Sequence, residues 1–500
     1  MKNTDSVWEC VDRLSGPAIE LSDAVWAVPE LNFDEYRSCA LHTETLEETG
    51  FPVTRNVAGL PTAVMGEAGE SGPVIAFLGE YDALPNLSNE AGVMEHKPVS
   101  GNSNGHACGH NLLGSAAFLA AAAVKTWLEE NKLHGRVRYY GCPAEEGGAG
   151  KSFMVRAGVF QDVDAAISWH PMCFTGVFPP SSLANIRIDF TFEGKAAHAA
   201  AAPHLGRSAL DAAEIMNVGV NYLREHMLPT SRIHYAFLDA GGTAPNVVQS
   251  KVVIRYTVRA LELSDMMELV ERVRKVARGA AMMTETSVSD QIISGMANLL
   301  PCPPLERAMY ASFERLGPPS FNDEDLAWAK EMQKTFPSTD IQSAFRLVGQ
   351  PPRDTPLADF ILPLIGGRAS MGSTDVGDVS WAVPTVQALG ATCAIGTQLH
   401  SWQMTAQGKS QIAHKGMVHV AKIMAATATD LLRDKALLEA AKADHAERLK
   451  VQPYICPIPD DVGPAIQPVP VAVCSRSPVF HACIFRGKPR TIQQAQPLDR

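Results

Sequence analysis

Apolar residues recur at helical spacing over the first fifty residues of the chain. This pattern predicts an amphipathic helix over residues 7–28 that ends before Pro29, and a second helix over residues 34–49 that stops at Gly50. An alanine-rich stretch further on, residues 112–130, also predicts a helix. Between and after these helices, short apolar runs have the length of buried strands, namely residues 74–78, 136–140 and 165–168.

Each of these three predicted strands is followed by polar residues that could bind a metal or take part in catalysis. The first strand leads to Glu80 and Asp82, the second to Glu145-Glu146 and the third to His170. Open α/β sheets build their sites at the carboxyl ends of their strands. The spacing therefore predicts an α/β domain whose site lies at this edge of the sheet.

The pattern changes near residue 183 to strands of alternating polarity. The predicted elements are a strand, a helix, two strands, a helix and a strand: residues 186–192, 208–225, 232–238, 252–259, 264–283 and 287–293. This β-α-β-β-α-β order is typical of a ferredoxin-like α+β unit. We therefore expect a mixed-sheet α/β catalytic domain, residues 1–182 and 296–440, interrupted by an inserted ferredoxin-like lid, residues 183–295. A helix near residues 411–433 closes the fold. The chain becomes Pro-rich beyond residue 450, and residues 441–500 are expected to be an irregular extension.

Composition narrows the class of protein. A chain of 500 residues is longer than one hydrophobic core usually organises. A content of 46% hydrophobic and 19% charged residues is ordinary for a folded, globular chain. A net charge of −11 argues against nucleic acid or an anionic membrane as partner. The polar start of the chain lacks the apolar run of a signal peptide, and no membrane span is expected. The ten cysteines are scattered, so we expect them to be reduced and the protein to be cytoplasmic.

The densest chemical signal is the segment Asn-Gly-His-Ala-Cys-Gly-His-Asn at residues 104–111. Cys108 and His110 can both reach one ion only if the backbone turns, and the flanking glycines allow this. With Glu146, His170 and His400 they would form a set suited to Zn²⁺ or Mn²⁺. Taken singly, a Cys near a His is more often packed in a core, adjacent acids usually form a solvated face, and His170 and His400 could be core histidines.

Glu145 beside Glu146 changes this picture. A structural zinc site usually closes at four ligands, whereas an additional acid next to a ligand is typical of an open site with a base for an attacking water. The set therefore predicts a metallohydrolase. A rival from another class is a non-catalytic protein that is stabilised by metal and binds a small ligand.

These motifs resemble the M20 metallopeptidase family, and in particular its amidohydrolase branch with the pattern His-Ala-Cys-Gly-His-[Asp/Asn]. The resemblance spans about residues 10–435, and two runs, residues 143–151 and 203–212, are closest to the p-aminobenzoyl-glutamate hydrolase group. Other matching segments are residues 79–85, 165–171, 194–204 and 241–248. Asn111 stands where many members of the branch carry Asp, so a charge at that position is lost.

The resemblance implies two divalent metal ions, Zn or Mn, held by five residues: Cys108, His110, Glu146, His170 and His400. It implies Glu145 as general base and acid, and Asp82 as the carboxylate that orients a metal-binding imidazole. It implies that His198 of the lid stabilises the oxyanion, often in the partner subunit, with help from Asn246. Arg207 is the lid cation expected to bind a substrate carboxylate, with a surface ion pair as the alternative. The roles of Glu80, Asp375 and Asp378 stay open.

The implied activity is hydrolysis of the amide bond of an N-acyl amino acid with an aromatic acyl part, such as p-aminobenzoyl-glutamate. Indole-acetyl or benzoyl conjugates and dipeptides are the alternative substrates. The resemblance also implies a homodimer formed through the lid, and it leaves open whether a second, related subunit is needed.

Overall fold

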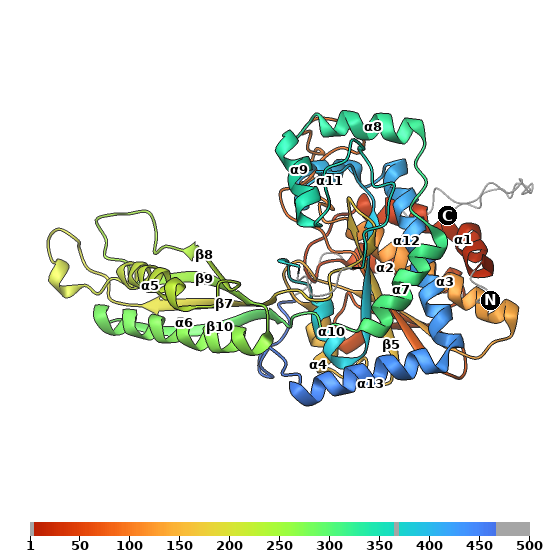
Figure 1. Ribbon diagram of the computed structural model, residues 1–500. Coiled ribbons are helices and arrows are strands. Elements are labelled where there is room, and N and C mark those ends of the chain that lie inside the picture. Colours follow the sequence, from red (N-terminus) through yellow and green to blue (C-terminus); the bar gives the residue numbers. More distant parts are fainter. Residues whose placement is uncertain (1–4, 365–369, 467–500) are drawn as a thin grey trace, which may run out of the picture. The chain divides into compact units, whose positions relative to one another are not determined.

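The computed structural model describes residues 5–364 and 370–466, and it contains two β-sheets (Figure 1). The larger sheet has seven strands in the order β1-β2-β4-β3-β5-β11-β6. Its four central strands run parallel to one another: β3 pairs with β4 and β5, and β5 pairs with β11. The strands β2 and β6 on either side are antiparallel to them. The strand bounds are β1 Val53–Arg55, β2 Val64–Ala68, β3 Val74–Glu80, β4 Arg136–Cys142, β5 Ala165–Met172, β6 Gly176–Val177 and β11 Thr385–Ala391.

Helices that are long and apolar on one side form the core against this sheet. The helices α1, α3 and α12 contact one another, and α3 and α12 also contact the strands, with Phe77, Trp169 and Ala388 in the shared core. Their bounds are α1 Asp5–Trp26, α2 Tyr36–Glu48, α3 His110–Asn131, α4 Gly150–Arg156 and α12 Gln411–Arg433. The predicted helices over residues 7–28, 34–49, 112–130 and 411–433 are thus confirmed with small shifts at their ends.

The smaller sheet confirms the predicted β-α-β-β-α-β unit. Its strands are all antiparallel in the order β10-β7-β9-β8, and the helices α5 and α6 pack on it around a core of its own. The bounds are β7 Ala184–Glu193, α5 Ala209–Leu223, β8 Arg232–Asp239, β9 Lys251–Ala260, α6 Leu263–Thr284 and β10 Ser287–Met296. By residue contacts, both sheets belong to one unit that ends at Ala465. The predicted domain division at residues 182 and 295 stays a prediction. These positions lie next to the beginning of β7 and the end of β10.

The α/β pattern resumes after β10, as expected. The remaining helices are α7 Pro303–Leu316, α8 Asp323–Gln333, α9 Ser338–Leu347, α10 Val376–Ala382, α11 Trp402–Gln407 and α13 Lys435–Val451. The expectation of an irregular extension over 441–500 is wrong for its beginning, because α13 continues to Val451 and packs against α7. Beyond it, Arg156 donates to the carbonyl oxygens of Pro459 and Val462, so this stretch is attached to the domain. Residues 467–500 lie outside the described residues.

One helix of the described chain, α3, is long and apolar enough to cross a membrane by length and composition. Within the protein, 89% of its most apolar window is buried. Its neighbours are α1, α12 and the strands of the large sheet. This burial is that of a core helix.

The contact between α12 and β11 can be tested at Gly416. A Cβ there would lie 2.0 Å from the carbonyl oxygen of Ala391, whereas a Cβ at Gly279 in α6 meets no heavy atom within 4 Å. We expect Gly416→Ala to lower the free energy of unfolding by about 1–3 kcal/mol. Gly279→Ala should leave it unchanged or raise it by up to about 1 kcal/mol, because alanine favours the helix. Denaturant unfolding of both variants measures this, and equal stability of the two would contradict the packing described.

Candidate active site

The Cys/His cluster is held together by two unusual backbone positions. Gly109 adopts a left-handed conformation (φ 79°), and a Cβ there would lie 2.9 Å from Pro171, so only glycine lets the chain turn between Cys108 and His110. His400 is also left-handed (φ 59°), and its N–H donates to the carbonyl oxygen of Ala107. The loop with His400 is thereby attached directly to the loop with Cys108.

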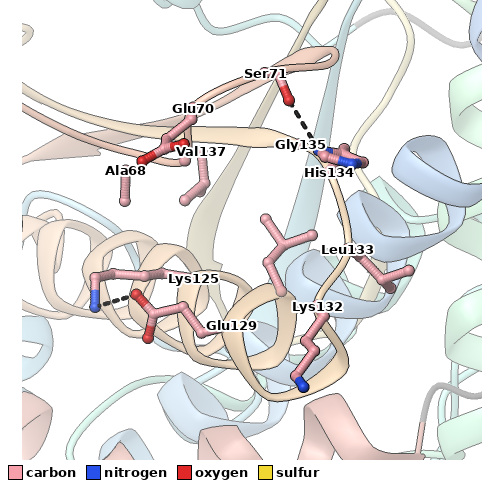
Figure 2. Close-up of a pocket in the computed structure, with 12 residues that line it drawn as sticks. Ala68, Glu70, Ser71, Lys125, Glu129, Lys132, Leu133, His134, Gly135 and Val137 are labelled. Carbon is pink, nitrogen blue, oxygen red and sulfur yellow. Dashed lines mark hydrogen bonds and ion pairs between the residues drawn. The ribbon is translucent and has the colours of Figure 1, made fainter.

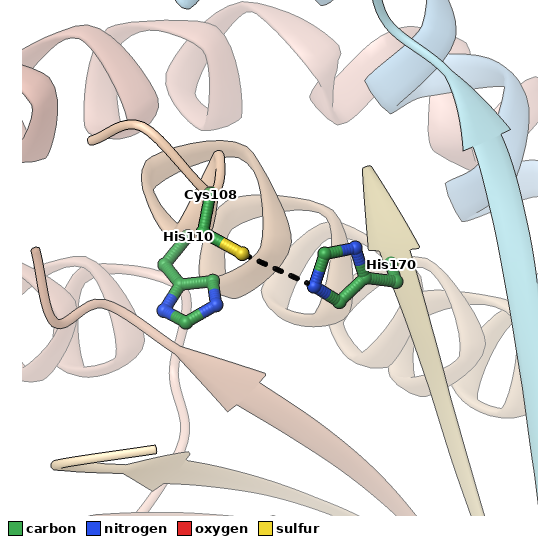
Figure 3. Close-up of side chains that lie close together, drawn as sticks. All are labelled: Cys108, His110 and His170. Atoms are coloured by element: carbon green, nitrogen blue, oxygen red, sulfur yellow. Dashed lines mark hydrogen bonds between the residues drawn. The ribbon is translucent and has the colours of Figure 1, made fainter. Parts of the chain in front are cut away.

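The predicted ligands converge. Three groups of side chains have their donor atoms within 4.8 Å of one another: Cys108, His110 and His170; Cys108, Glu146 and His400; and Glu80, His110 and Glu145. Figure 3 shows the first group, in which the Cys108 Sγ points at His170 Nε2 at 3.4 Å. One expectation needs correction: His170 lies inside β5, which extends to Met172, and not in the loop after it. The neighbouring Trp169 packs in the helical core, so His170 faces the opposite side of the sheet.

These residues fit a metal site by two observations of the structure. Among the described residues, His110 Nε2 and Glu146 Oε1 are buried without a hydrogen bond, and the polar groups 3.3 Å from them, those of Glu80 and His400, belong to the same cluster. Buried polar atoms are nearly always partnered, so orphaned ones at a cluster of donors favour a bound ion. The donor set of thiol, imidazoles and carboxylates is also that of borderline divalent ions.

Asp82 connects the ligands to one another. Its Oδ1 lies 2.8 Å from His110 Nδ1, and its Oδ2 accepts the N–H of Glu146 at 2.8 Å. With Nδ1 engaged, the imidazole of His110 turns its Nε2 toward the cluster. This contact is the one expected of a carboxylate that orients a metal ligand.

The acids of the cluster crowd each other. Burial and the charges of Glu80 and Glu146 raise the pKa of Glu145 well above its usual range. Burial also acts to raise the pKa of Glu146, but the adjacent His400, His110 and Cys108 together outweigh it and lower that pKa to about 2. Carboxylates packed this closely favour a bound cation, which reverses the repulsion between them.

The thiol and imidazole are in states that metal binding can use. Burial, with the charge of Glu146, raises the pKa of Cys108 well above its usual range, so the thiol requires a nearby cation to ionise. Burial lowers the pKa of His170, which keeps its imidazole neutral. A neutral imidazole is the form that ligates metal ions.

A buried lysine that sequence reasoning missed lies behind the cluster. Lys151 is fully buried, and its Nζ lies 2.5 Å from Glu80 Oε1 and 2.7 Å from Asp375 Oδ1. The other oxygen of Glu80 lies 3.3 Å from His110 Nε2. Asp378 bonds elsewhere, to Ser152, to the N–H of Ala297 and to the hydroxyl of Tyr454. In the sequence, Lys151 could have been found only from its position in the Gly-rich run after β4.

Two other polar residues of the His-Ala-Cys-Gly-His-Asn segment turn away from the cluster. His106 Nε2 pairs with the carbonyl oxygen of Val25, and Asn111 donates to Ser22 and to the carbonyl oxygen of Gly408. Asn111 therefore serves packing at the start of α3.

A pocket of about 610 Å³ is lined by four of the five predicted metal ligands, namely Cys108, Glu146, His170 and His400. The small sheet contributes a polar wall to it, in which Asn185 lies opposite Arg259 in the β7–β9 register and Arg187 lies two residues along β7. Arg187 donates to the carbonyl oxygens of Glu146 and Gly147, while Arg259 Nε is buried without a partner among the described residues. Burial and the nearby Arg187 lower the pKa of Arg259. The apolar lining residues are Leu84, Met172, Phe178, Met296 and Leu399.

The predicted lid residues lie together but outside this pocket. His198 is exposed, and its Nδ1 accepts the N–H groups of Ala200 and Ala201. The carbonyl oxygen of Asn246 accepts the N–H of Ala199, which brings the two loops side by side. Arg207 forms an ion pair with Glu285 at 2.8 Å, the alternative weighed for it from the sequence.

A second pocket, of about 380 Å³, lies between the end of α3 and the strands β2 and β4 (Figure 2). Its polar groups are engaged with each other: Lys125 pairs with Glu129, and Ser71 bonds to His134. None of the metal-ligand groups found among the described residues lies there. Of these two pockets, the one at the Cys108 cluster is therefore the candidate active site.

Comparison with known proteins agrees with this site. Residues 76–346 match the model of peptidase family M20/M25/M40. The chain is 46% identical over 458 residues to one of the subunits of p-aminobenzoyl-glutamate hydrolase from Escherichia coli, covering 89% of this chain and 95% of that protein. It is 30% identical to the Xaa-Arg dipeptidase of Mus musculus, covering 88% and 91%.

Among solved structures, the fold resembles the Bacillus subtilis YxeP protein, described as a dinuclear metal-binding peptidase of the M20 family. The TM-score is 0.55 at 20% identity, covering 84% of this chain and 99% of that one. The predicted family, fold class and hydrolase activity are thus confirmed. The chain belongs to peptidase family M20/M25/M40 and is a hydrolase of that family.

Proposed function

We propose that this protein hydrolyses the amide bond of an N-acyl amino acid that combines an aromatic acyl group with an acidic amino acid, such as p-aminobenzoyl-glutamate. One observation carries the proposal: a single pocket joins the metal-ligand residues, an apolar wall and two arginines. The name of the 46% identical relative supports the same substrate. A dipeptide ending in arginine fits less well, because Arg187 and Arg259 would repel its side chain.

The positions of the side chains support the catalytic roles that we propose. Two divalent ions, Zn or Mn, would be held by five residues: Cys108, His110, Glu146, His170 and His400. The ions would supply the positive charge that polarises the scissile carbonyl and acidifies the attacking water. Glu145 takes a proton from that water and passes it to the nitrogen of the leaving amino acid, so that the C–N bond breaks after the new C–O bond forms. Asp82 keeps the imidazole of His110 in the orientation this requires.

The small sheet would bind the leaving amino acid. Arg259 lines the pocket and its Nε has no partner among the described residues, and a guanidinium binds a carboxylate through two parallel hydrogen bonds. A glutamate conjugate carries two carboxylates, so Arg207 stays a candidate for the other one if the lid of a second chain supplies it.

We further propose a homodimer formed through the lid, in which His198 and Asn246 complete the site of the partner. Strand β8 is at the edge of the small sheet and exposes Tyr235, Phe237 and Leu238, which supports pairing there. The 46% identical relative is named as one subunit of its hydrolase, so a second, related subunit is an additional proposal. The eight described cysteines are all free thiols, in keeping with the proposed cytoplasmic location.

Replacement of the proposed base should separate chemistry from folding. We expect Glu145→Gln to keep its metal content and thermal stability and to lower kcat by about 10²–10⁴-fold, the usual contribution of a general acid–base group. The exposed Glu439→Gln, which makes the same change far from the pocket lining, should retain full activity. Near-normal turnover of p-aminobenzoyl-glutamate by Glu145→Gln would refute the role of this residue.

The carboxylate site can be tested with two arginines of one strand. Arg259→Gln should lower kcat/KM for p-aminobenzoyl-glutamate by about 10- to 100-fold relative to p-aminobenzoyl-glycinamide, because a charge-assisted contact is lost. Arg255→Gln is the matched control, since Arg255 lies on the same strand but pairs with Asp189 outside the pocket. If Arg207→Gln abolishes the preference for the acidic substrate while Arg259→Gln keeps it, the carboxylate site belongs to Arg207.

Action of the lid across a dimer can be tested by mixing inactive variants. Glu145→Gln and His198→Ala subunits should each be nearly inactive as pure proteins. A mixture with exchanged subunits should recover up to about a quarter of wild-type activity, because half of the dimers are mixed and each holds one intact site. Mass measurement confirms the exchange, and no recovery in exchanged dimers would mean that His198 does not act in trans.

A further inference from the structure

The pocket contains a buried amide without a partner. Gln387 lies on β11 and is only 3% exposed. Its Oε1 has no hydrogen-bond partner within the described part of the chain. Buried polar atoms without partners are rare in folded proteins, and leaving one unpaired is costly. An unpaired acceptor in the lining of a binding pocket therefore points to a ligand.

The neighbouring strand places this amide on the pocket side of the large sheet. Gln387 is the register partner of Ser168 on the parallel strand β5, and the Oγ of Ser168 is also buried without a partner. Trp169 and Ala388, the next residues of the two strands, belong to the core with α3 and α12. Side chains alternate along a strand, so Ser168 and Gln387 face away from that core, as His170 does.

The surroundings of Gln387 suit the acyl group rather than the amino acid. The main-chain carbonyl oxygen of Gln387 accepts the N–H of Phe178, and Phe178 and Met172 line the same pocket. The two pocket arginines lie instead on the small sheet. If the acidic amino acid occupies the arginine side, the aromatic ring lies along the large sheet, where Met172 and Phe178 line the pocket with Gln387.

We propose that Gln387 selects the acyl group of the substrate by accepting a hydrogen bond from a polar N–H or O–H substituent on the aromatic ring, such as a primary aromatic amine. This inference rests on the proposed function and adds to it the chemistry of the acyl group. A site built to bind a donor rejects the analogue that lacks it, because the oxygen of the protein is then buried without a partner.

Three conjugates that differ in one ring substituent test this. The 4-aminobenzoyl, 4-hydroxybenzoyl and 4-methylbenzoyl conjugates of glutamate have nearly the same size, and only the methyl group cannot donate. We expect the wild-type protein, loaded with Mn²⁺ or Zn²⁺, to prefer the first two over the third by about 10- to 100-fold in kcat/KM. In Gln387→Met, which keeps the length of the side chain, the preference should fall to near 1.

Two further measurements keep the test decisive. Gln403→Met makes the same change at a half-buried glutamine outside the pocket and should retain the wild-type preference. Gln387→Asn, which withdraws the amide by one methylene, should weaken the preference and serves if the methionine variant does not fold. An equal rate on all three conjugates by the wild-type protein, or an unchanged preference in both folded Gln387 variants, would overturn the inference.

Failure of the proposed function would give a different result. If the wild-type protein hydrolyses none of the three conjugates, the proposed reaction is wrong. Calorimetric titration of the metal-loaded protein with 4-aminobenzoate and 4-methylbenzoate then tests Gln387 without catalysis. Tighter binding of the amine that disappears in Gln387→Met supports the selecting role, and equal binding of both acids refutes it.

Discussion

The arrangement of the site depends on Asp82, a buried carboxylate whose two oxygens serve two different segments. One oxygen lies against the imidazole of His110 at the start of α3, and the other accepts the N–H of Glu146 in the loop after β4. Both contacts are made by a carboxyl group, and hydrogen bonds to carboxylates are among the shorter and stronger ones. A shift of either segment would leave one oxygen of a buried carboxylate without its partner. The ligand side chains are therefore positioned by the protein itself, and metal binding requires little rearrangement.

A second group of buried charges supports the same region. Lys151 lies between Glu80 and Asp375, and all three side chains are almost completely excluded from solvent. Removing a charge from water is costly unless an opposite charge is adjacent, so these groups stabilise one another. One lysine against two carboxylates still leaves an excess of negative charge beside Glu145 and Glu146. That excess is compatible with a folded protein because the site is suited to cations.

The sequence predicted the elements well because their hydrophobic periods are long and uninterrupted. The helix over residues 411–433 and the six elements of the small sheet were found almost at their true bounds. Cys108, His110, Glu145 and Glu146 were found because they are close in sequence to one another or to glycines. Four residues were missed: Lys151, Arg187, Arg259 and Gln387. An isolated polar residue in a strand or helix gives no local sign of the site that it lies near. The beginning of the predicted irregular extension was wrong, since the few buried positions of α13, such as Leu438 and Ala441, give a weak helical period.

The two walls of the pocket divide the recognition of an N-acyl amino acid between them. The small sheet presents Asn185, Arg187 and Arg259, while the strands of the large sheet carry the predicted metal ligand His170 together with Met172 and Gln387. Arg187 belongs to the polar wall, yet its guanidinium donates to the carbonyl oxygens of Glu146 and Gly147. The sheet that would bind the leaving group is thus bonded to the loop that carries the proposed base. Because β7 pairs with β9, the strand of Arg259, a displacement of β7 would disturb the position of Arg259 as well as the orientation of Glu145.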